Sequence, residues 1–195
     1  VFSIIVPVFN EAPRLKRFLE SLQPLRGQCA ELILVDGGST DGSRGIAKRL
    51  VDQLICTAAG RAQQMNAGAQ RARGELLIFL HADTQLQPDA MSELMVRWRG
   101  SARCWGRFNI KLSSDRFLFR VIELFINWRS RLTAIATGDQ AIFVEREAFL
   151  RLGGYAQIPL MEDIELCKRL KRECRPICID APVVTSSRRR SEERR

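Results

Sequence analysis

The feature that most constrains the fold is a regular alternation of short apolar runs with helical segments over the first eighty residues. The apolar runs predict strands at 2–6, 31–35, 53–56 and 76–80. Between them, the spacing of apolar residues and of helix-breaking residues predicts helices at 13–22, 43–50 and 61–72. Strands that alternate with helices form a largely parallel sheet covered by helices. The sequence therefore predicts a doubly wound α/β fold.

The second half of the chain is less regular, with helices expected at 88–98 and from 162, and strands at 108–112, 140–144 and 177–179. Its most apolar segment is FLFRVIELFINW, residues 117–128. This segment is shorter than the roughly 18 residues of a membrane span. Because it is apolar on both sides, we expect a helix buried in the core. The alternative is a helix that lies against a membrane or a partner.

A chain of 195 residues without a Pro/Gly/Ser-rich linker is expected to form a single domain. We expect this domain over residues 1–187, with one half at about 1–84 and a second at 85–187. Residues 188–195 form a basic tail of arginines and glutamates that is most simply solvated.

The formal net charge of +9 indicates a surface that attracts phosphate-rich or anionic partners. Nucleic acid is not expected, because no reading motif or zinc-finger spacing is present. The six cysteines follow no disulfide framework, and with one histidine in the chain they do not suggest a zinc site. No segment resembles a signal peptide, so a cytoplasmic location is expected.

Acidic side chains follow three of the predicted strands, at Glu11, Asp36 and Asp83. In open α/β sheets, ligands bind beyond the carboxyl ends of the strands. Carboxylates there can accept hydrogen bonds from a nucleotide or hold Mg²⁺ or Mn²⁺. Taken singly, each is equally typical of a helix cap or a turn.

Four motifs together carry more information than any of them alone. They are VPVFNE (residues 6–11), LVDGGSTDGS (34–43), FLHADT (79–84) and MEDIELCKRL (161–170). In this order and spacing they resemble the family 2 inverting glycosyltransferases, in particular small bacterial single-domain members. The resemblance implies a GT-A type fold, which is a Rossmann-like, nucleotide-binding mixed sheet flanked by helices, with residues 1–84 as the nucleotide-binding half and 85–187 as the acceptor half.

The resemblance also implies roles for individual residues. Residues matched to donor nucleotide binding are Pro7, Val8, Asn10, Glu11, Asp36, Arg61, Asn66, His81 and Ala82. Asp83 matches the last aspartate of the family's DXD motif, the ligand of a divalent metal, Mn or Mg. His81 stands where that motif often has its first aspartate, which leaves the usual ribose contact in question.

The second half of the chain matches the family's acceptor-side motif and its acid pair. Residues matched to acceptor binding are Gly138, Asp139 and Gln140. Asp163 matches the general base that removes the acceptor's proton, and Glu162 is a neighbour that orients the acceptor. Without the resemblance, a Glu-Asp pair at the start of a helix simply places negative charge at the positive end of the helix dipole, where it is favourable.

The expected activity is transfer of one sugar from a nucleotide-diphosphate sugar to an acceptor hydroxyl. UDP-sugars are favoured over GDP-sugars, and a lipid-linked acceptor is considered. The absence of a QxxRW-like motif and of spanning helices favours single transfer over polymer synthesis. The cluster SSRRR at 186–190 suggests a further hypothesis, peripheral attachment to the anionic inner face of a membrane. The family's small members continue a little further, so the chain is expected to be shortened at its C-terminal end.

Three other functions remain to be weighed. A sugar nucleotidyltransferase would carry a Gly-rich loop with a basic residue after its first strand, which VPVFNE lacks. An aspartate-nucleophile phosphatase needs two aspartates one residue apart after the first strand, and these are missing too. A catalytically silent module that binds nucleotide, anionic lipid or protein would fold normally and be indifferent to loss of Asp163.

Overall fold

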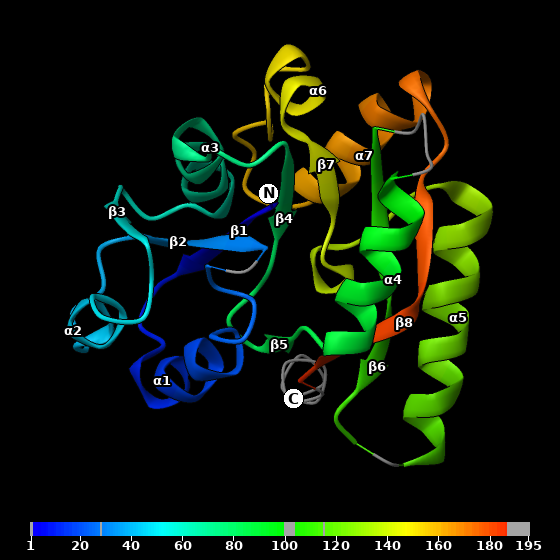
Figure 1. The fold of residues 1–195 in the computed structure, drawn as a ribbon. Helices are drawn as coiled ribbons and strands as arrows, with labels where there is room; N and C mark the ends of the chain where they lie inside the picture. The colour runs from blue at the N-terminus through cyan, green and yellow to red at the C-terminus, as the bar shows by residue number, and fades with distance from the viewer. Residues whose placement is uncertain (1, 28, 100–103, 115, 187–195) are drawn as a thin grey trace.

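The computed structural model describes residues 2–27, 29–99, 104–114 and 116–186 of the chain (Figure 1). These residues form one mixed sheet of eight strands in the order β3-β2-β1-β4-β7-β6-β8-β5. The strands are β1 (Phe2–Val8), β2 (Ala30–Asp36), β3 (Gln53–Cys56), β4 (Leu76–Phe79), β5 (Thr84–Gln85), β6 (Trp105–Leu112), β7 (Phe143–Glu145) and β8 (Ile177–Thr185). The helices are α1 (Ala12–Ser21), α2 (Ser43–Ala47), α3 (Arg61–Arg71), α4 (Pro88–Arg99), α5 (Phe117–Thr133), the 3₁₀ turn η1 (Gly138–Gln140), α6 (Arg146–Arg151) and α7 (Glu162–Glu173).

The predicted α/β fold is confirmed. Strands β1 to β4 are parallel, with β1 between β2 and β4. The sheet is mixed because β7 runs antiparallel to both β4 and β6, while β6 and β8 are parallel. The chain winds outward from β1 in one direction to β3 and in the other to β4. The carboxyl ends of β1, β2 and β4 therefore meet at a switch point, where α/β sheets bind ligands.

The core lies on both faces of the sheet. Ile4 and Ile5, neighbours in β1, are fully buried on opposite faces. Helices α1, α2 and α4 pack on the Ile4 face, and helices α3, α6 and α7 on the Ile5 face. Gly68 allows α3 to approach closely, because a Cβ at this position would come within 2.5 Å of the Ile5 side chain. This contact places the start of α3 beside the end of β1.

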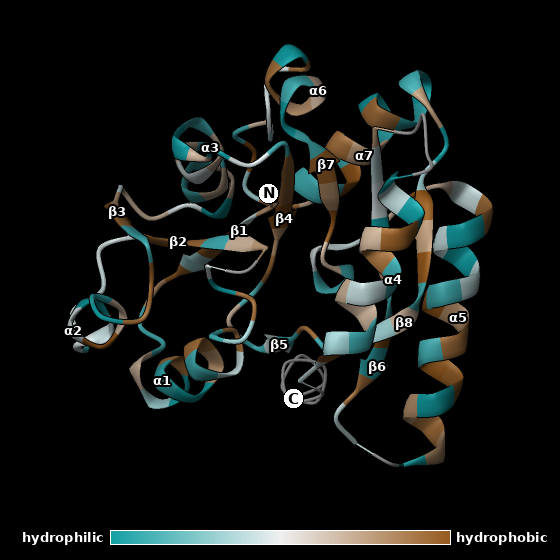
Figure 2. Ribbon diagram, in the orientation of Figure 1, coloured by the Kyte–Doolittle hydropathy of each residue, from teal (hydrophilic) through white to brown (hydrophobic). Residues whose placement is uncertain are grey.

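The prediction of a core helix at 117–128 is wrong. Helix α5 spans this segment, but its buried side chains are Glu123 and Ser130, and most of its large apolar side chains face solvent. Figure 2 shows brown, apolar residues along α5, which lies at the edge of the molecule. The inward side of the helix therefore carries polar residues beside Phe119, Ile122 and Ile126, which are half-buried against the core, while the broader apolar side faces solvent.

The cause lies in the short partner of β6. Strand β7 pairs with β6 only at Trp105 and Gly106, which leaves the rest of that edge of β6 without a strand. Polar side chains of α5 occupy it instead: Asn127 Oδ1 accepts from the Ile110 N–H at 2.9 Å, and Asn127 Nδ2 donates to the Ile110 carbonyl at 3.1 Å. Glu123 accepts from the Leu112 N–H. Because buried backbone groups need partners, the edge of β6 holds Glu123 and Asn127 inward, and the opposite, apolar side of α5 faces solvent.

None of the helices in the described ranges is long and apolar enough to cross a bilayer. All six cysteines are free thiols. The tail at 188–195, with most of the SSRRR cluster, lies outside the described residues. One sheet runs through both segments of the chain, and the division into halves at about residue 84 stays a prediction.

Candidate active site

A cleft of about 310 Å³ opens at the carboxyl ends of β1 and β4. Its volume is within the range of small-molecule sites. Six of the residues matched to nucleotide binding line it together: Pro7, Val8, Glu11, Arg61, His81 and Ala82. They come from the end of β1, the start of α3 and the segment after β4. The sheet topology thus unites residues that lie up to 75 positions apart.

Asp36 ends β2 beside Val8, which lines the cleft, and it is fully buried. Its Oδ2 accepts from Arg44 Nε at 2.6 Å and from the N–H groups of Gly38 and Ser39 at 3.1 and 3.0 Å. Burial by itself raises the pKa of this carboxyl, but the hydrogen bonds from Ser39, Arg44 and Gly38 outweigh it and hold the pKa below its ordinary value. Oδ1 is buried with no hydrogen-bond partner in the described part of the chain. Asp36 therefore carries, next to the cleft, a charged acceptor atom that has no partner among the described residues.

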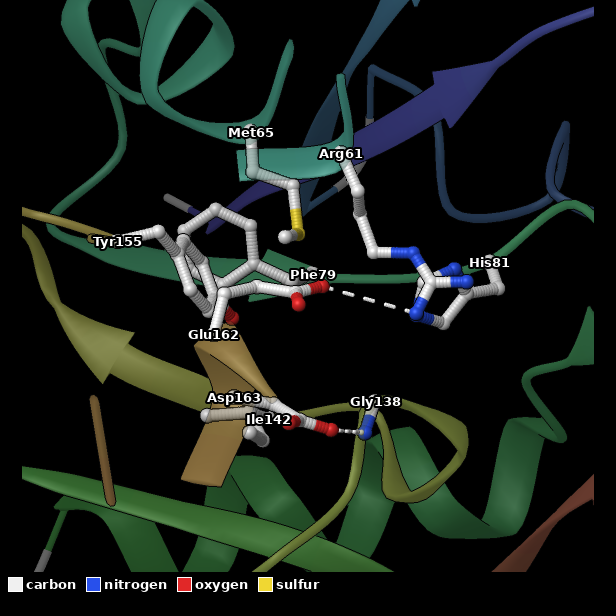
Figure 3. A pocket seen from close by; sticks show the side chains of 9 residues that line it. All are labelled: Arg61, Met65, Phe79, His81, Gly138, Ile142, Tyr155, Glu162 and Asp163. Carbon is white, nitrogen blue, oxygen red and sulfur yellow. Dashed lines mark hydrogen bonds and ion pairs between the residues drawn. The ribbon is translucent and has the colours of Figure 1, made fainter. Parts of the chain in front are cut away.

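A smaller cavity adjoins the cleft, and Arg61 and His81 line both (Figure 3). The other residues that line it are Met65, Phe79, Gly138, Ile142, Tyr155, Glu162 and Asp163. It measures about 10 Å³, the space of about one water molecule. The Glu-Asp pair at the start of α7 is thus brought next to the cleft.

Both acids of the pair have partners across this small cavity. Glu162 Oε1 lies 3.6 Å from Arg61 Nη1, and Asp163 Oδ2 accepts from the Gly138 N–H at 2.6 Å (Figure 3). Glu162 is buried, whereas Arg61 is half exposed. These two contacts join α7 to α3 and to η1, so the acid pair is held by elements that lie far apart in the sequence.

Gly138 sits directly against His81. A Cβ at position 138 would lie 2.5 Å from His81 Nε2, too close for an ordinary contact. His81 is itself buried, so the ring has little room to withdraw. A glycine is therefore needed at 138 for His81 and Asp163 to approach the same turn.

Several matched residues have structural partners instead of lining these two cavities. Asn66 exchanges two hydrogen bonds of 2.8 Å with the backbone of Tyr155. The Asn10 carboxamide accepts from the Thr40 N–H at 2.9 Å. Gln140 is buried and donates to Ser130 Oγ at 3.0 Å, and Asp139 is half-buried in the same turn. Contacts of these residues with a donor or acceptor stay predictions.

Asp83 lies on the far side of Ala82 and lines a separate groove of about 410 Å³ with Arg14 and Arg17. Ala82 lines both this groove and the cleft. Within the described residues, no group of three or more His, Cys, Asp or Glu side chains could hold a metal. A metal that also binds a diphosphate needs one or two protein carboxylates, so Asp83 fits such an ion but not one held by protein alone.

Sequence reasoning missed three residues of the site. Gln64 lines the cleft and donates to the carbonyls of Val8 and Val35 at 2.9 and 2.7 Å, which ties α3 to the ends of β1 and β2. Phe9 lines the cleft with a half-exposed ring. Tyr155 backs the acid pair, and its burial raises the pKa of its hydroxyl. The available signals were weak: a glutamine inside GRAQQMNAG, an aromatic within VPVFNE and the chain's single tyrosine.

A family model described as glycosyl transferase family 2 matches residues 3–146. The chain therefore belongs to glycosyl transferase family 2. A PGL/p-HBAD biosynthesis glycosyltransferase of Mycobacterium bovis is 42% identical over 44% of this chain and 36% of its own length. An undecaprenyl-phosphate 4-deoxy-4-formamido-L-arabinose transferase of Pseudomonas paraeruginosa is 31% identical over 49% of this chain and 31% of its own length. The matched part is thus about a third of the length of these relatives.

Solved structures share the fold over nearly the whole chain. A mannosyltransferase from Pyrobaculum calidifontis, in complex with GDP-Man and Mn²⁺, has a TM-score of 0.72 at 23% identity and covers 95% of this chain and 56% of its own. Staphylococcus aureus TarS, in complex with UDP-GlcNAc, has a TM-score of 0.74 at 16% identity and covers 95% and 58%. The fold is therefore that of the GT-A glycosyltransferases, as the motifs predicted.

Proposed function

We propose that this chain transfers one sugar from a nucleotide-diphosphate sugar to an acceptor hydroxyl, with inversion at the anomeric carbon. The observation that carries the proposal is the junction of the 310 Å³ cleft with the cavity of the acid pair, through the shared side chains of Arg61 and His81. The cleft suits a nucleotide, and the acid pair suits proton removal. The bond that joins the sugar of the donor to its nucleotide diphosphate would then lie where the cleft meets the cavity of the acid pair.

The donor base belongs beside Asp36. Its unpaired, charged Oδ1 suits the ring N–H of uracil or guanine, once a side-chain movement admits the base to this buried atom. The cleft has a volume typical of ligand sites, and UDP-sugars are taken as the preferred donors. The solved relatives in complex with GDP-Man and with UDP-GlcNAc show that this fold accommodates either nucleotide.

In the transfer step, the acceptor hydroxyl attacks the anomeric carbon while Asp163 takes its proton. The bond from that carbon to the diphosphate oxygen breaks, and the diphosphate leaves with the electron pair. Arg61 pairs with Glu162 at a loose 3.6 Å, so it can turn from this acid toward the leaving diphosphate. A divalent cation held by Asp83 would neutralise charge on the same group. Since the smaller cavity, which the acid pair lines, has space for about one water molecule, side chains must move to admit the sugar.

The first test is calorimetric titration of UDP and GDP, with and without Mn²⁺, into the wild type and Asp83→Ala. We expect UDP to bind more tightly with the metal present, and the variant to lose that increment. Binding of neither nucleotide would remove the proposal and favour the silent binding module. Metal-independent binding that is equal in both proteins would remove Asp83 from the site.

The second test separates donor binding from chemistry. Asp163→Asn should bind UDP like the wild type but lose roughly 100-fold or more in the rate of sugar transfer, because the base is gone. The rate is measured as UDP released from several UDP-sugars in the presence of a total lipid extract. Asp89→Asn, at the start of α4, is the matched control and should keep its rate. Wild-type turnover in Asp163→Asn would exclude Asp163 as the base.

A further inference from the structure

Helix α5 presents a continuous apolar surface to solvent. We call this surface the apolar face of α5, and its members are each 47–83% exposed: Phe117, Leu118, Val121, Leu124, Phe125, Trp128 and Leu132. At 100° per residue they cover an arc of roughly 120° along the whole helix. They make up more than half of the large apolar side chains exposed in the described ranges.

The size of this face exceeds what scattered surface residues explain. Phe117, Phe125 and Trp128, at 83%, 61% and 61% exposed, alone present roughly 300–500 Å². The largest apolar patch on a typical monomer is about 300–600 Å², and four aliphatic side chains add to these three here. Because Glu123 and Asn127 are fixed on the edge of β6, the helix cannot rotate to bury the face.

The charges around the face are positive. Arg116, Arg120, Arg129 and Arg131 stand at its end and along its two sides, against one acid in residues 116–133. Arg131 forms an ion pair with Asp180 of β8. The acid within 116–133, Glu123, is buried on the opposite side and pairs with Arg120, whose Nη1 lies within 3.0 Å of both its oxygens. Arg116 and Arg129 therefore carry the positive charge beside the face that these two acids do not balance. An apolar strip with tryptophan and phenylalanine, edged by arginines, suits the boundary between acyl chains and anionic headgroups.

We propose that α5 lies in the surface of an anionic lipid bilayer and docks the enzyme there through its apolar face. A second copy of the chain fits the face less well, because pairing would bring arginines together with no acidic side chain of α5 available to meet them. The helix ends five residues before Gly138, so docking would bring the acid-pair side of the site close to the lipid surface. The proposal does not depend on the nucleotide chemistry.

The test is co-sedimentation of the full chain with vesicles of phosphatidylcholine and phosphatidylglycerol in a ratio of about 7 to 3. We expect the wild type to bind, and the double variant Phe125→Gln/Trp128→Gln to bind at least roughly tenfold less tightly. Glutamine keeps the helix propensity, so circular dichroism should be unchanged. Val96→Gln, at a site on α4 that is at least as exposed, is the matched control and should bind like the wild type.

Two further measurements decide whether the apolar face of α5 binds lipid or a second copy of the chain. Trp128 fluorescence should shift to shorter wavelength on vesicles, and Trp128→Phe should lack that shift. Failure of the wild type to sediment, or equal sedimentation of the double variant, would overturn the proposal. A concentration-dependent dimer that the double variant loses, without vesicle binding, would assign the face to a second copy. UDP titration of the double variant should match the wild type, so failure of this proposal and failure of the donor site are distinguishable.

Discussion

Asp36 shows how one buried carboxylate combines a structural and a binding role. Asp36→Asn keeps the shape but removes the charge that three donors stabilise. We expect the free energy of unfolding to fall by about 1–2 kcal/mol, since Arg44 is half exposed and screened by solvent. UDP should bind roughly tenfold more weakly or worse. Urea denaturation and calorimetry measure the two effects.

The pH dependence of this effect has a definite sign. Because the pKa of Asp36 is held below its ordinary value of 3.8, its contribution to stability is fully present above that value and is lost as pH falls through the lowered pKa. The difference in unfolding free energy between wild type and Asp36→Asn should therefore be constant from about pH 8 to 5 and shrink below about pH 4. A constant gap at pH 3 would show that the difference does not arise from the charge.

Gly138 provides a second test with single residues. Gly138→Ala should displace His81, because the new Cβ would lie 2.5 Å from its ring nitrogen. We expect sugar transfer to fall roughly tenfold or more while the chain stays folded. His81→Ala in the same chain makes room for the methyl group. In a double-mutant cycle the two changes should be strongly non-additive. Additive effects would indicate that the two residues act separately.

At the scale of elements, the contact of α5 with the edge of β6 makes a polar residue of this helix more important for stability than a large apolar one. Asn127→Leu removes two hydrogen bonds and leaves the N–H and carbonyl of Ile110 unpaired under the helix. We expect a loss of about 2–3 kcal/mol in unfolding free energy, measured by urea denaturation. Phe125→Gln on the exposed face should change it by less than about 0.5 kcal/mol. A larger cost for Phe125→Gln would mean that the apolar face is buried in solution.

At the scale of the whole molecule, the site lies where one sheet brings both parts of the chain together. Ligands at this junction should stabilise the entire fold, because they bind the folded chain alone. UDP at about 100 times its dissociation constant should add about 2.7 kcal/mol and raise the melting temperature by roughly 5–10 °C. Differential scanning calorimetry measures the shift. In Asp83→Ala the part of the shift that depends on Mn²⁺ should disappear, and its persistence would place the metal elsewhere.

The sequence could predict the strands and helices of the first half because each has a local signal. A continuous apolar run such as 76–80 is typical of a strand buried on both faces of a sheet, and Pro13 suits the first turn of a helix. The same order of strands and helices predicted that the acidic residues after the strands lie at one edge of the sheet, because parallel strands end at the same edge. Their motifs led to the family, which a match over residues 3–146 confirms.

Contacts between distant segments were not accessible in this way. The pairing of Asn66 with the backbone of Tyr155 joins positions 89 residues apart, and nothing in either segment predicts the other. Which side of α5 faces the sheet depended on the length of β7. A short β7 leaves part of the β6 edge without a strand, and that part needs polar partners. Local hydropathy could not show it, because that segment is apolar on both sides.

The sequence by itself thus determined the order of elements, the edge of the sheet that carries the acids, and the family. Tertiary structure alone decided which of the matched residues share a cleft, that Asp36 keeps one oxygen unpaired, and that α5 turns its apolar side outward. The physical reason is that propensity and periodicity act within a few residues of the chain. Hydrogen-bond satisfaction and close packing are settled only when segments far apart in sequence meet.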